Sequence, residues 1–547
     1  MRLSFLLLAA ALPLTAQAPR RPPLDSSAVS DIATLLMLED TRTFDSTTFS
    51  RLLASPHPEV RRRAMLSVAR INDKRGVALL RARPLDADTS LAATTVFAVG
   101  QLKDTLTTAW FDSLLTNPGT APTVLTEAAC ALGKFKTAGA REVLARFLTR
   151  TPASSRTNDA IGEALLSIGR ANARGDLAPI TRWTSSKNDE IRWRATWELF
   201  RPRDPAAVST LLTLSKDPSA YVRSWAVRGL VKTQADSASL GARAEAQLLA
   251  STHDADRRVR TEAIRALASY PDSSAVAVLV NALRDPDSWI SVSAAEGLAR
   301  PKAQWTVASL VDAGRSSRSC AVRVTAMRSL QSFASAEARM VATDIASDAV
   351  PYCQSAAAQL LRDTIPNAGR GGARGQRQRP ALVARPMEEY RGIVQKWIVP
   401  AYMGRPLPRA RWETSRGPIE LELYAGDAPL AMDAFEHIMS AGTIAGTEFS
   451  RVVPDFVDQQ ATIRDAAVQR DEVNRHRLTR GNLAWASSGL DTGRPGYTLN
   501  HTPQPHNEGD FTSLGHVIVG QDVVDRMELG DRVTAAKLLT GMRVLER

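Results

Sequence analysis

Three side chains between residues 449 and 459 could act together on a peptide bond. This segment, FSRVVPDFVDQ, places Arg451, Phe456 and Gln459 among alternating apolar residues. If it begins as a strand, Pro454 and Asp455 turn the chain before Phe456 and bring a guanidinium, an apolar ring and an amide to one small groove. Such a groove suits the binding of a proline and the polarisation of its amide bond. The alternative is a strand with one solvated arginine.

Rotation about an X-Pro bond is the chemistry that these groups could serve. The uncatalysed barrier is about 18–20 kcal/mol, and twisting the amide breaks its resonance and localises electron density. A fixed cationic donor favours the twisted state over both planar isomers, so it lowers the barrier without a nucleophile, metal or cofactor. His501 and His506 are expected to be loop or structural histidines, because no acidic or thiol partner lies at ligand spacing. We therefore predict no cofactor and no metal site.

Five segments of the C-terminal part resemble the cyclophilin-type peptidyl-prolyl cis-trans isomerases, in the same order. They are GPIELELY with the following AP, FSRVVPDFVDQ, RGNLAWA, TPQPHNEG and LGHVIVGQDVVD. The corresponding family patterns are the opening strand with its APxTVxNF helix, FHRV-(x)2-GF-(x)2-Q, RGxLSMA, TPxPHLDG and VFGRVIEGMDVVD. The resemblance implies a closed β-barrel capped by helices, over residues 387–547 with its core at 411–547.

The resemblance also implies roles for individual residues. Arg451 matches the catalytic arginine that stabilises the twisted amide, and Gln459 matches the glutamine that positions the substrate backbone. Phe456 matches a wall of the proline pocket. The further substrate-binding residues implied are Val457, Trp485, Tyr497, Thr498, His506 and Phe511.

Several positions depart from the family pattern. Ser450 replaces the histidine of FHRV, and Gln460 and Ala461 replace the two glycines that follow the family's pocket glutamine. Gly496 and Thr498 replace the glutamine and second phenylalanine of GSQFFI. Losing that ring removes about 1.5–3 kcal/mol of apolar contact, which Phe511 could restore. Two functions follow: an active isomerase, which we favour, and a non-catalytic interaction protein whose degenerate barrel only captures proline-containing segments.

The first two thirds of the chain repeat one pattern of residues. An apolar residue, often followed by Arg, precedes a small residue by four positions and another apolar residue by eight. The small residue stands at 64, 95, 128, 164, 195, 226, 263, 294, 326 and 357. Two helices in each repeat predict an α-solenoid over residues 30–363, and the pattern resembles the short HEAT repeats. Stacking of such repeats leaves an extended concave surface, which we expect to bind a protein partner.

The arginines of this pattern have two possible roles. They are Arg61, Arg192, Arg223, Arg260 and Arg323. They could form an anion-binding ladder, but we favour pairing with the Asp-rich turn of the same repeat.

The N-terminus of the 547-residue chain predicts export. Arg2 precedes an apolar stretch at residues 3–14 and a small-x-small site at 16–18, so residues 1–18 are expected to form a signal peptide. No later stretch is long enough to cross a membrane, and we expect a periplasmic or extracellular protein. Residues 364–386 are Gly/Arg-rich and are predicted to be a flexible tether. Although the net charge is +12, export argues against a nucleic-acid partner.

Three cysteines are too few for a disulfide framework, and their spacing matches no metal motif. Cys320 and Cys353 fall in neighbouring repeats, where an oxidising compartment would permit a bond. Buried free thiols are the favoured expectation for these two residues.

Overall fold

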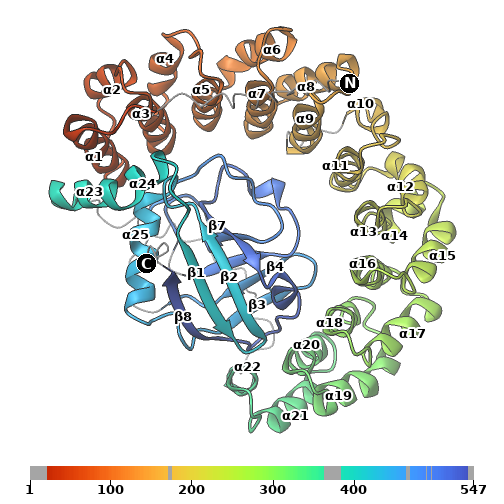
Figure 1. The fold of residues 1–547 in the computed structure, drawn as a ribbon. Helices are drawn as coiled ribbons and strands as arrows, with labels where there is room; N and C mark the ends of the chain where they lie inside the picture. The colour runs from red at the N-terminus through yellow and green to blue at the C-terminus, as the bar shows by residue number, and fades with distance from the viewer. Residues whose placement is uncertain are drawn as a thin grey trace, which may run out of the picture.

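The computed structural model describes residues 21–170, 175–362, 383–463, 469–487, 489–493 and 496–539. The predicted signal peptide and residues 364–382 of the predicted tether lie outside this part. Helices α1–α22 form an arc, the solenoid, and the strand-rich C-terminal domain, the barrel, lies inside it (Figure 1). The fold is therefore a multidomain one, an all-α HEAT-like solenoid followed by a cyclophilin-like barrel. No helix in the described ranges is both long and apolar enough to cross a membrane.

Two rows of helices build the solenoid. The inner row is α1 (Ser26–Asp40), α3 (Pro58–Ile71), α5 (Thr89–Gln101), α7 (Pro122–Phe135), α9 (Asn158–Arg170), α11 (Asp189–Phe200), α13 (Ala220–Arg228), α16 (Arg257–Leu267), α18 (Ser288–Gly297), α20 (Cys320–Gln331) and α22 (Pro351–Arg362). The others are α2 (Ser46–Leu53), α4 (Gly76–Arg81), α6 (Thr108–Thr116), α8 (Ala138–Arg150), α10 (Ala178–Thr181), α12 (Val208–Leu214), α14 (Lys232–Ser237), α15 (Gly241–Ser251), α17 (Ser273–Ala282), α19 (Val307–Ser316) and α21 (Ser335–Ile345).

The small residue of each repeat lies where two inner helices meet. Nine of the ten positions are alanines with 0% exposure, and the tenth, Thr95, is 6% exposed. Consecutive inner helices pack on one another from α1 to α22. A larger side chain there would separate the helices, because interiors are close-packed. The repeat pattern thus predicted the inner row and its packing positions correctly.

The repeat arginines pair with aspartates, but not within their own repeat. Arg223 is typical: its Nε donates to Asp254 Oδ2 at 2.8 Å, and Asp254 lies in the turn before the next inner helix. The other pairs are Arg61–Asp86, Arg192–Asp217, Arg260–Asp287 and Arg323–Asp348. The same guanidinium also donates to a carbonyl of its own turn, as Arg223 Nη1 does to Asp217 O at 2.9 Å. The expectation of pairing within one repeat was therefore wrong, because each arginine reaches forward to join consecutive repeats.

Among the described residues, the barrel consists of eight antiparallel strands and a few helices. The strands are β1 (Arg409–Thr414), β2 (Gly417–Leu423), β3 (Phe449–Val453), β4 (Val457–Gln460), β5 (Asn482–Trp485), β6 (Tyr497–Asn500), β7 (Ser513–Val519) and β8 (Val533–Leu539), in the order β3-β4-β6-β5-β7-β2-β1-β8. The two ends of this order meet: Phe449 N donates to Asp531 O at 2.7 Å, and Val533 N donates to Thr447 O at 3.0 Å. The helices are α23 (Met387–Ile393), α24 (Val399–Tyr402), α25 (Pro429–Ser440) and α26 (Gln521–Val524), with a π-helical turn at Val394–Ile398.

The concave surface of the solenoid holds the barrel of the same chain. Contacts run along most of the arc, from α3, where Arg62 Nη1 donates to Asp427 Oδ1 at 2.8 Å, to α22, where Tyr352 Oη donates to Ser450 O at 3.3 Å. The last residues of the predicted tether are also held, since Arg385 pairs with Asp433 at 2.8 Å. No pattern in the sequence predicted this docking.

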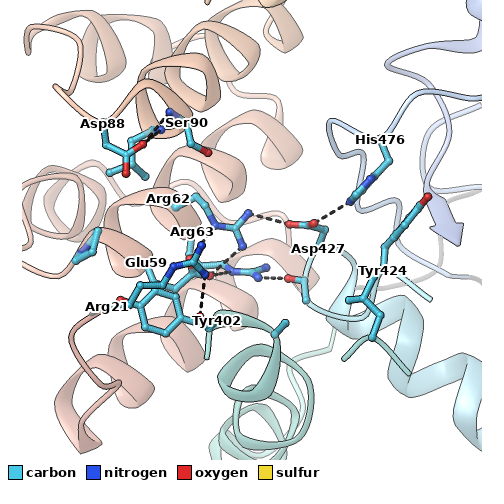
Figure 2. A pocket seen from close by; sticks show the side chains of 15 residues that line it. Arg21, Glu59, Arg62, Arg63, Asp88, Ser90, Tyr402, Tyr424, Asp427 and His476 are labelled. Atoms are coloured by element: carbon cyan, nitrogen blue, oxygen red, sulfur yellow. Dashed lines mark hydrogen bonds and ion pairs between the residues drawn. The ribbon is translucent and has the colours of Figure 1, made fainter. Parts of the chain in front are cut away.

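A cavity of about 360 Å³ lies between α3 and the barrel (Figure 2). Asp427 reaches into it and accepts from Arg62 and from His476 Nε2, the latter at 2.9 Å. Burial opposes ionisation of this carboxyl, but Arg62 and His476 hold the pKa of Asp427 well below its usual range. The His476 ring stacks on Tyr424 with centroids 3.6 Å apart. The wall of the cavity thus includes an ion pair that joins the two domains, between Arg62 of the solenoid and Asp427 of the barrel.

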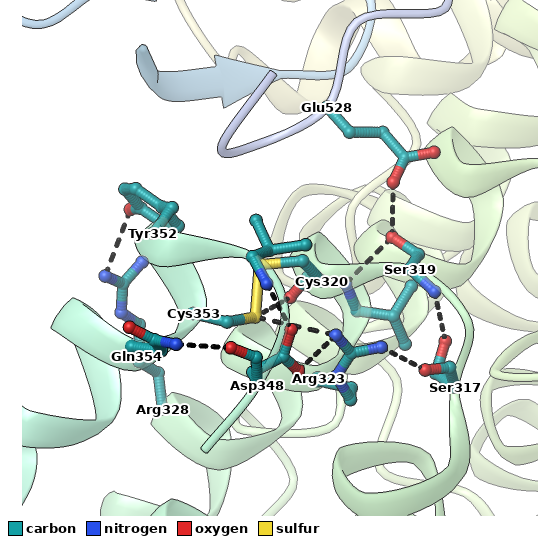
Figure 3. Close-up of a disulfide and its surroundings, with 12 residues drawn as sticks. Ser317, Ser319, Cys320, Arg323, Arg328, Asp348, Tyr352, Cys353, Gln354 and Glu528 are labelled. Atoms are coloured by element: carbon teal, nitrogen blue, oxygen red, sulfur yellow. Dashed lines mark hydrogen bonds and ion pairs between the residues drawn. A yellow bond between two sulfur atoms is a disulfide. The ribbon is translucent and has the colours of Figure 1, made fainter. Parts of the chain in front are cut away.

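Cys320 and Cys353 form a disulfide between α20 and α22 (Figure 3). Their Cα atoms are 5.9 Å apart, and 33 positions separate them in the chain. The expectation of two free thiols was wrong, because the stacking of consecutive repeats brings the two side chains together. The third cysteine, Cys130, is free and buried. Next to the disulfide, Ser319 Oγ donates to Glu528 of the barrel at 2.5 Å.

Candidate active site

Arg451, Phe456 and Gln459 come together on the β3–β4 hairpin. Arg451 on β3 lies opposite Gln459 on β4 in the antiparallel register, and its Nη1 is 3.4 Å from Gln459 Oε1. The turn between the strands, where Asp455 has a φ of +52°, places the Phe456 ring centroid 5.6 Å from the Arg451 guanidinium carbon. The local pattern of the sequence thus builds the guanidinium, ring and amide arrangement expected of it.

Arg451 is exposed, yet the surrounding protein lowers its pKa through burial. It remains cationic at neutral pH, because an arginine does not lose its proton in that range. No carboxylate in the described part of the chain pairs with it. Its donors are therefore open to a ligand.

Thr498 extends the groove onto the next strand. It lies opposite Gln459 in the β4–β6 register, so Arg451, Gln459 and Thr498 form one row across three neighbouring strands. Thr498 is half-buried and offers a methyl and a hydroxyl in place of a ring. Val457, two residues before Gln459, is buried and lies opposite Asn500.

His506 supplies a second ring next to Phe456. The two centroids are 6.0 Å apart with nearly parallel planes, at 14°. Burial, reinforced by the positive charges of Arg201, Arg170 and Arg228, lowers the pKa of His506 to about 4. The imidazole is therefore neutral at physiological pH and acts as a packing surface.

Two of the predicted substrate-binding residues lie in the barrel core. Trp485 and Tyr497 are 1% and 0% exposed, and their rings stack with centroids 4.9 Å apart. Their assignment to the groove is corrected by this burial: successive strand residues point to opposite faces, so Tyr497 points inward where Thr498 points outward. Phe511 is half-buried in the loop before β7. That it replaces the missing ring at Thr498 stays a prediction.

A buried acid–base pair lies under the hairpin. Asp458 and His501, both fully buried, approach to 3.0 Å between Oδ2 and Nε2. Burial raises the pKa of Asp458 to about 6. His501 also stacks on Trp289 of α18, with centroids 4.8 Å apart, so the pair joins the barrel to the solenoid. No cluster of three or more His, Cys, Asp or Glu side chains that could hold a metal ion occurs among the described residues.

The segments on either side of the predicted proline-binding residues contact the solenoid. Arg265 of α16 donates to Pro454 O in the β3–β4 turn at 2.9 Å, and Lys103, which follows α5, pairs with Asp510 in the loop before β7 at 2.9 Å. Tyr221 of α13 shares a 2.7 Å hydrogen bond with Thr502. Sequence reasoning missed these residues, since nothing in their local patterns distinguishes them from solvated side chains.

Comparison with known proteins agrees with this geometry. Residues 409–546 match the family described as cyclophilin type peptidyl-prolyl cis-trans isomerase, and residues 245–318 match HEAT repeats. A peptidyl-prolyl cis-trans isomerase B of Bacillus subtilis is 34% identical over 121 residues, covering 21% of this chain and 85% of the relative. A peptidyl-prolyl cis-trans isomerase of Synechococcus elongatus is 29% identical over 142 residues, covering 24% of this chain and 98% of the relative.

Solved structures of cyclophilins are similar to about a quarter of the chain. A crystal structure of a Cryptosporidium parvum cyclophilin type peptidyl-prolyl cis-trans isomerase matches with 17% identity and a TM-score of 0.23, covering 25% of this chain and 99% of the other. The matched residues, the relatives and the hairpin geometry together show that the chain belongs to the cyclophilin-type peptidyl-prolyl cis-trans isomerase family.

Proposed function

We propose that this protein is an exported peptidyl-prolyl cis-trans isomerase in which Arg451 stabilises the twisted X-Pro amide. The observation that carries the proposal is the row formed by Arg451 and Gln459 beside the Phe456 ring. A proline packed on Phe456 and His506 brings its amide nitrogen towards a cation that no carboxylate among the described residues neutralises. The guanidinium then donates to the nitrogen as its lone pair localises, which lowers the barrier.

Gln459 has a different role in this mechanism. Its amide lies next to the guanidinium and can hold the substrate backbone through a donor and an acceptor at once. Because His506 is neutral, it adds no charge beside the proline ring. The groove thus combines one cationic donor with apolar walls, which suits a neutral ring next to an amide that becomes polarised.

Two features support export. The N-terminal residues have the composition of a signal peptide. The Cys320–Cys353 disulfide fits an oxidising compartment such as the periplasm or the extracellular space, because cytosolic thiols are normally kept reduced.

The solenoid does not present the open concave binding surface that the repeats led us to expect. Its concave surface holds the barrel, so a client segment that reaches Arg451 lies between the barrel and the inner helices. We propose that the solenoid is a wall of the client-binding site, and that proline-containing segments of proteins are the clients.

A second candidate function is capture of proline-containing segments without turnover. The observation that favours it is Thr498, which lies beside Gln459 where a ring would enlarge the apolar wall. A weakly held proline could dwell near Arg451 too briefly to be isomerised.

Exchange NMR on an Ala-Pro peptide with the full chain separates the two. We expect kcat/KM to fall about 10²–10³-fold in Arg451→Ala, the usual loss for one transition-state donor. Arg409→Ala, an exposed arginine on β1, is the matched control and should keep the wild-type rate. Equal rates for wild type, Arg451→Ala and buffer would refute the isomerase, and peptide binding that persists would then support capture.

A further inference from the structure

The strand that carries Arg451 contains a β-bulge. In the β3–β4 register, Phe449 lies opposite Gln460 and Arg451 lies opposite Gln459, so Ser450 is one extra residue on β3. In a regular strand, residues two positions apart face the same side of the sheet. Phe449 is completely buried in the core, whereas Arg451 is exposed. The bulge therefore turns Arg451 away from the core and towards the groove, since an extra residue re-aims the side chains that follow it.

A side chain of the solenoid holds the carbonyl group of the bulged residue. Tyr352 on α22 donates from its Oη to Ser450 O at 3.3 Å. Arg328 on α20 donates to the same hydroxyl oxygen at 3.3 Å, which leaves the hydroxyl hydrogen for Ser450 (Figure 3). The Ser450 oxygen and the Arg451 nitrogen belong to one planar peptide group. This hydrogen bond therefore acts directly on the backbone that carries the guanidinium.

The same two helices also contact the segment that closes the barrel beside β3. Gly530 N donates to Phe449 O at 3.0 Å, and the φ of Gly530 is +90°. A Cβ atom at Gly530 would lie 2.9 Å from Tyr352 Cβ, so a glycine here lets α22 approach this closely. Ser319, which precedes α20, donates to Glu528 at 2.5 Å. The beginnings of α20 and α22 thus hold both the bulge and the segment next to it.

The disulfide joins these two points of contact. Cys320 directly follows Ser319, and Cys353 directly follows Tyr352. Their bond fixes the beginning of α22 to the beginning of α20, one residue away from each contact with the barrel (Figure 3). A side chain that is already fixed loses little further entropy when it binds, so Tyr352 can orient the bulge more strongly than a mobile side chain could.

We propose that Tyr352 is a positioning residue for Arg451, and that the Cys320–Cys353 bond holds Tyr352 in place. The inference rests on the proposed isomerase function of the same site. Tyr352 acts through the bulge and not on the twisted amide. A fixed donor depends on its placement, because a shift of about 1 Å can cost about 10²-fold in rate. The solenoid thus takes part in the reaction by orienting a donor of the barrel.

Tyr352→Phe tests the proposal, since it removes the hydroxyl and keeps the ring that packs on Gly530. Exchange NMR with an Ala-Pro peptide and the full chain gives kcat and KM. We expect kcat to fall about two- to tenfold, the factor for one hydrogen bond. KM should stay unchanged, because the proline still packs on Phe456 and His506. In an Arg451→Ala background the same substitution should change nothing further, whereas a merely structural residue would lower the rate equally in both backgrounds.

Hydrogen exchange of residues 449–453 measures the hold on the bulge without turnover. Tyr352→Phe should accelerate it about two- to tenfold, and Cys320→Ser combined with Cys353→Ser should also accelerate it. Tyr270→Phe is the matched control, because the Tyr270 hydroxyl donates to the carbonyl oxygen of Leu230 at 3.1 Å within the solenoid. It should leave both kcat and the exchange of residues 449–453 unchanged.

The two proposals fail in different ways. If the wild type is no faster than buffer, the isomerase fails, and the exchange of residues 449–453 still decides whether Tyr352 holds the strand. If the wild type turns the peptide over, an unchanged kcat, an unchanged exchange or an equal loss in both backgrounds would overturn the assignment of Tyr352. Exchange that the paired cysteine substitutions leave unchanged would overturn the role of the disulfide.

Discussion

Replacing Arg70 by Met should undock the barrel from the solenoid. The Arg70 guanidinium on α3 is completely buried and lies 2.9 Å from Glu39 of α1 and 3.6 Å from Glu472 of the barrel. It also donates to the carbonyl oxygens of Val473, at 3.1 Å, and Asp427. Both carboxylates are as buried as the arginine. One side chain thus compensates two buried acids and joins the two domains.

The expected cost follows from leaving those acids without their cation. Removing one partner of a buried ion pair costs about 3–5 kcal/mol, because the other charge stays buried. Met has a similar length and fills much of the space, so packing loss adds little. Hydrogen exchange of residues 469–479 should accelerate by about two to nearly four orders of magnitude, at 1.36 kcal/mol per tenfold.

The cost should also depend on pH in a defined direction. Burial and the neighbouring Glu39 raise the pKa of Glu472 to about 7, although Arg70 opposes the shift. Between about pH 4.3 and 7, Glu472 therefore keeps its proton in the folded state, whereas an ordinary glutamate in the unfolded state has released it. Stability is lost as the pH rises through this window. Without Arg70 the shift grows, so the penalty of Arg70→Met should be larger at pH 8 than at pH 5.

Arg51→Met is the matched control. Its guanidinium is 61% exposed and pairs with Asp31 at 2.9 Å on the surface, so its loss should cost at most about 1 kcal/mol. A penalty for Arg70→Met no larger than the control, or one that grows as the pH falls, would refute the reasoning.

Three further predictions concern the disulfide, the α18 contact and the groove. Cys353→Ser should lower the unfolding free energy of the last repeats by about 2–4 kcal/mol; hydrogen exchange of α22 measures it, and a reductant should affect the wild type but not the variant. Trp289→Ala removes the stack on His501 and should cost about 3–5 kcal/mol in urea unfolding, a value that a loss under 1 kcal/mol would contradict. Thr498→Phe should raise kcat/KM about tenfold or more by restoring about 1.5–3 kcal/mol of apolar contact; a decrease would indicate that Phe511 already fills the space.

Local patterns in the sequence predicted the elements of both domains. The spacing of small residues such as Ala226 identified the inner helices, because a helix repeats its faces over three or four positions. The alternation at residues 449–453 predicted β3, and the turn after it brought Phe456 next to Arg451. Such features depend on interactions between residues a few positions apart, so they can be predicted from the sequence alone.

Beyond the hairpin, the sequence does not separate side chains that face the groove from side chains of the core. Tyr497 and Thr498 are adjacent in the chain, yet one lies in the core and the other opposite Gln459. Only the register and closure of the barrel decide which of two neighbouring side chains faces the groove. The short segment around β6 carries no period long enough to settle it.

The docking of the two domains was decided by tertiary structure alone. Arg70 and Glu472 are hundreds of positions apart, and neither differs in its local pattern from a solvated charge. The curvature of the stacked repeats brings them together, whereas the stacking of consecutive repeats brings Cys320 to Cys353. The sequence by itself determined the solenoid and the Arg451 hairpin, because both follow from short-range patterns, and it indicated the barrel through the resemblance of five segments in order. What the concave surface holds, and which charges border the groove, depends on curvature summed over many repeats, which no single segment encodes.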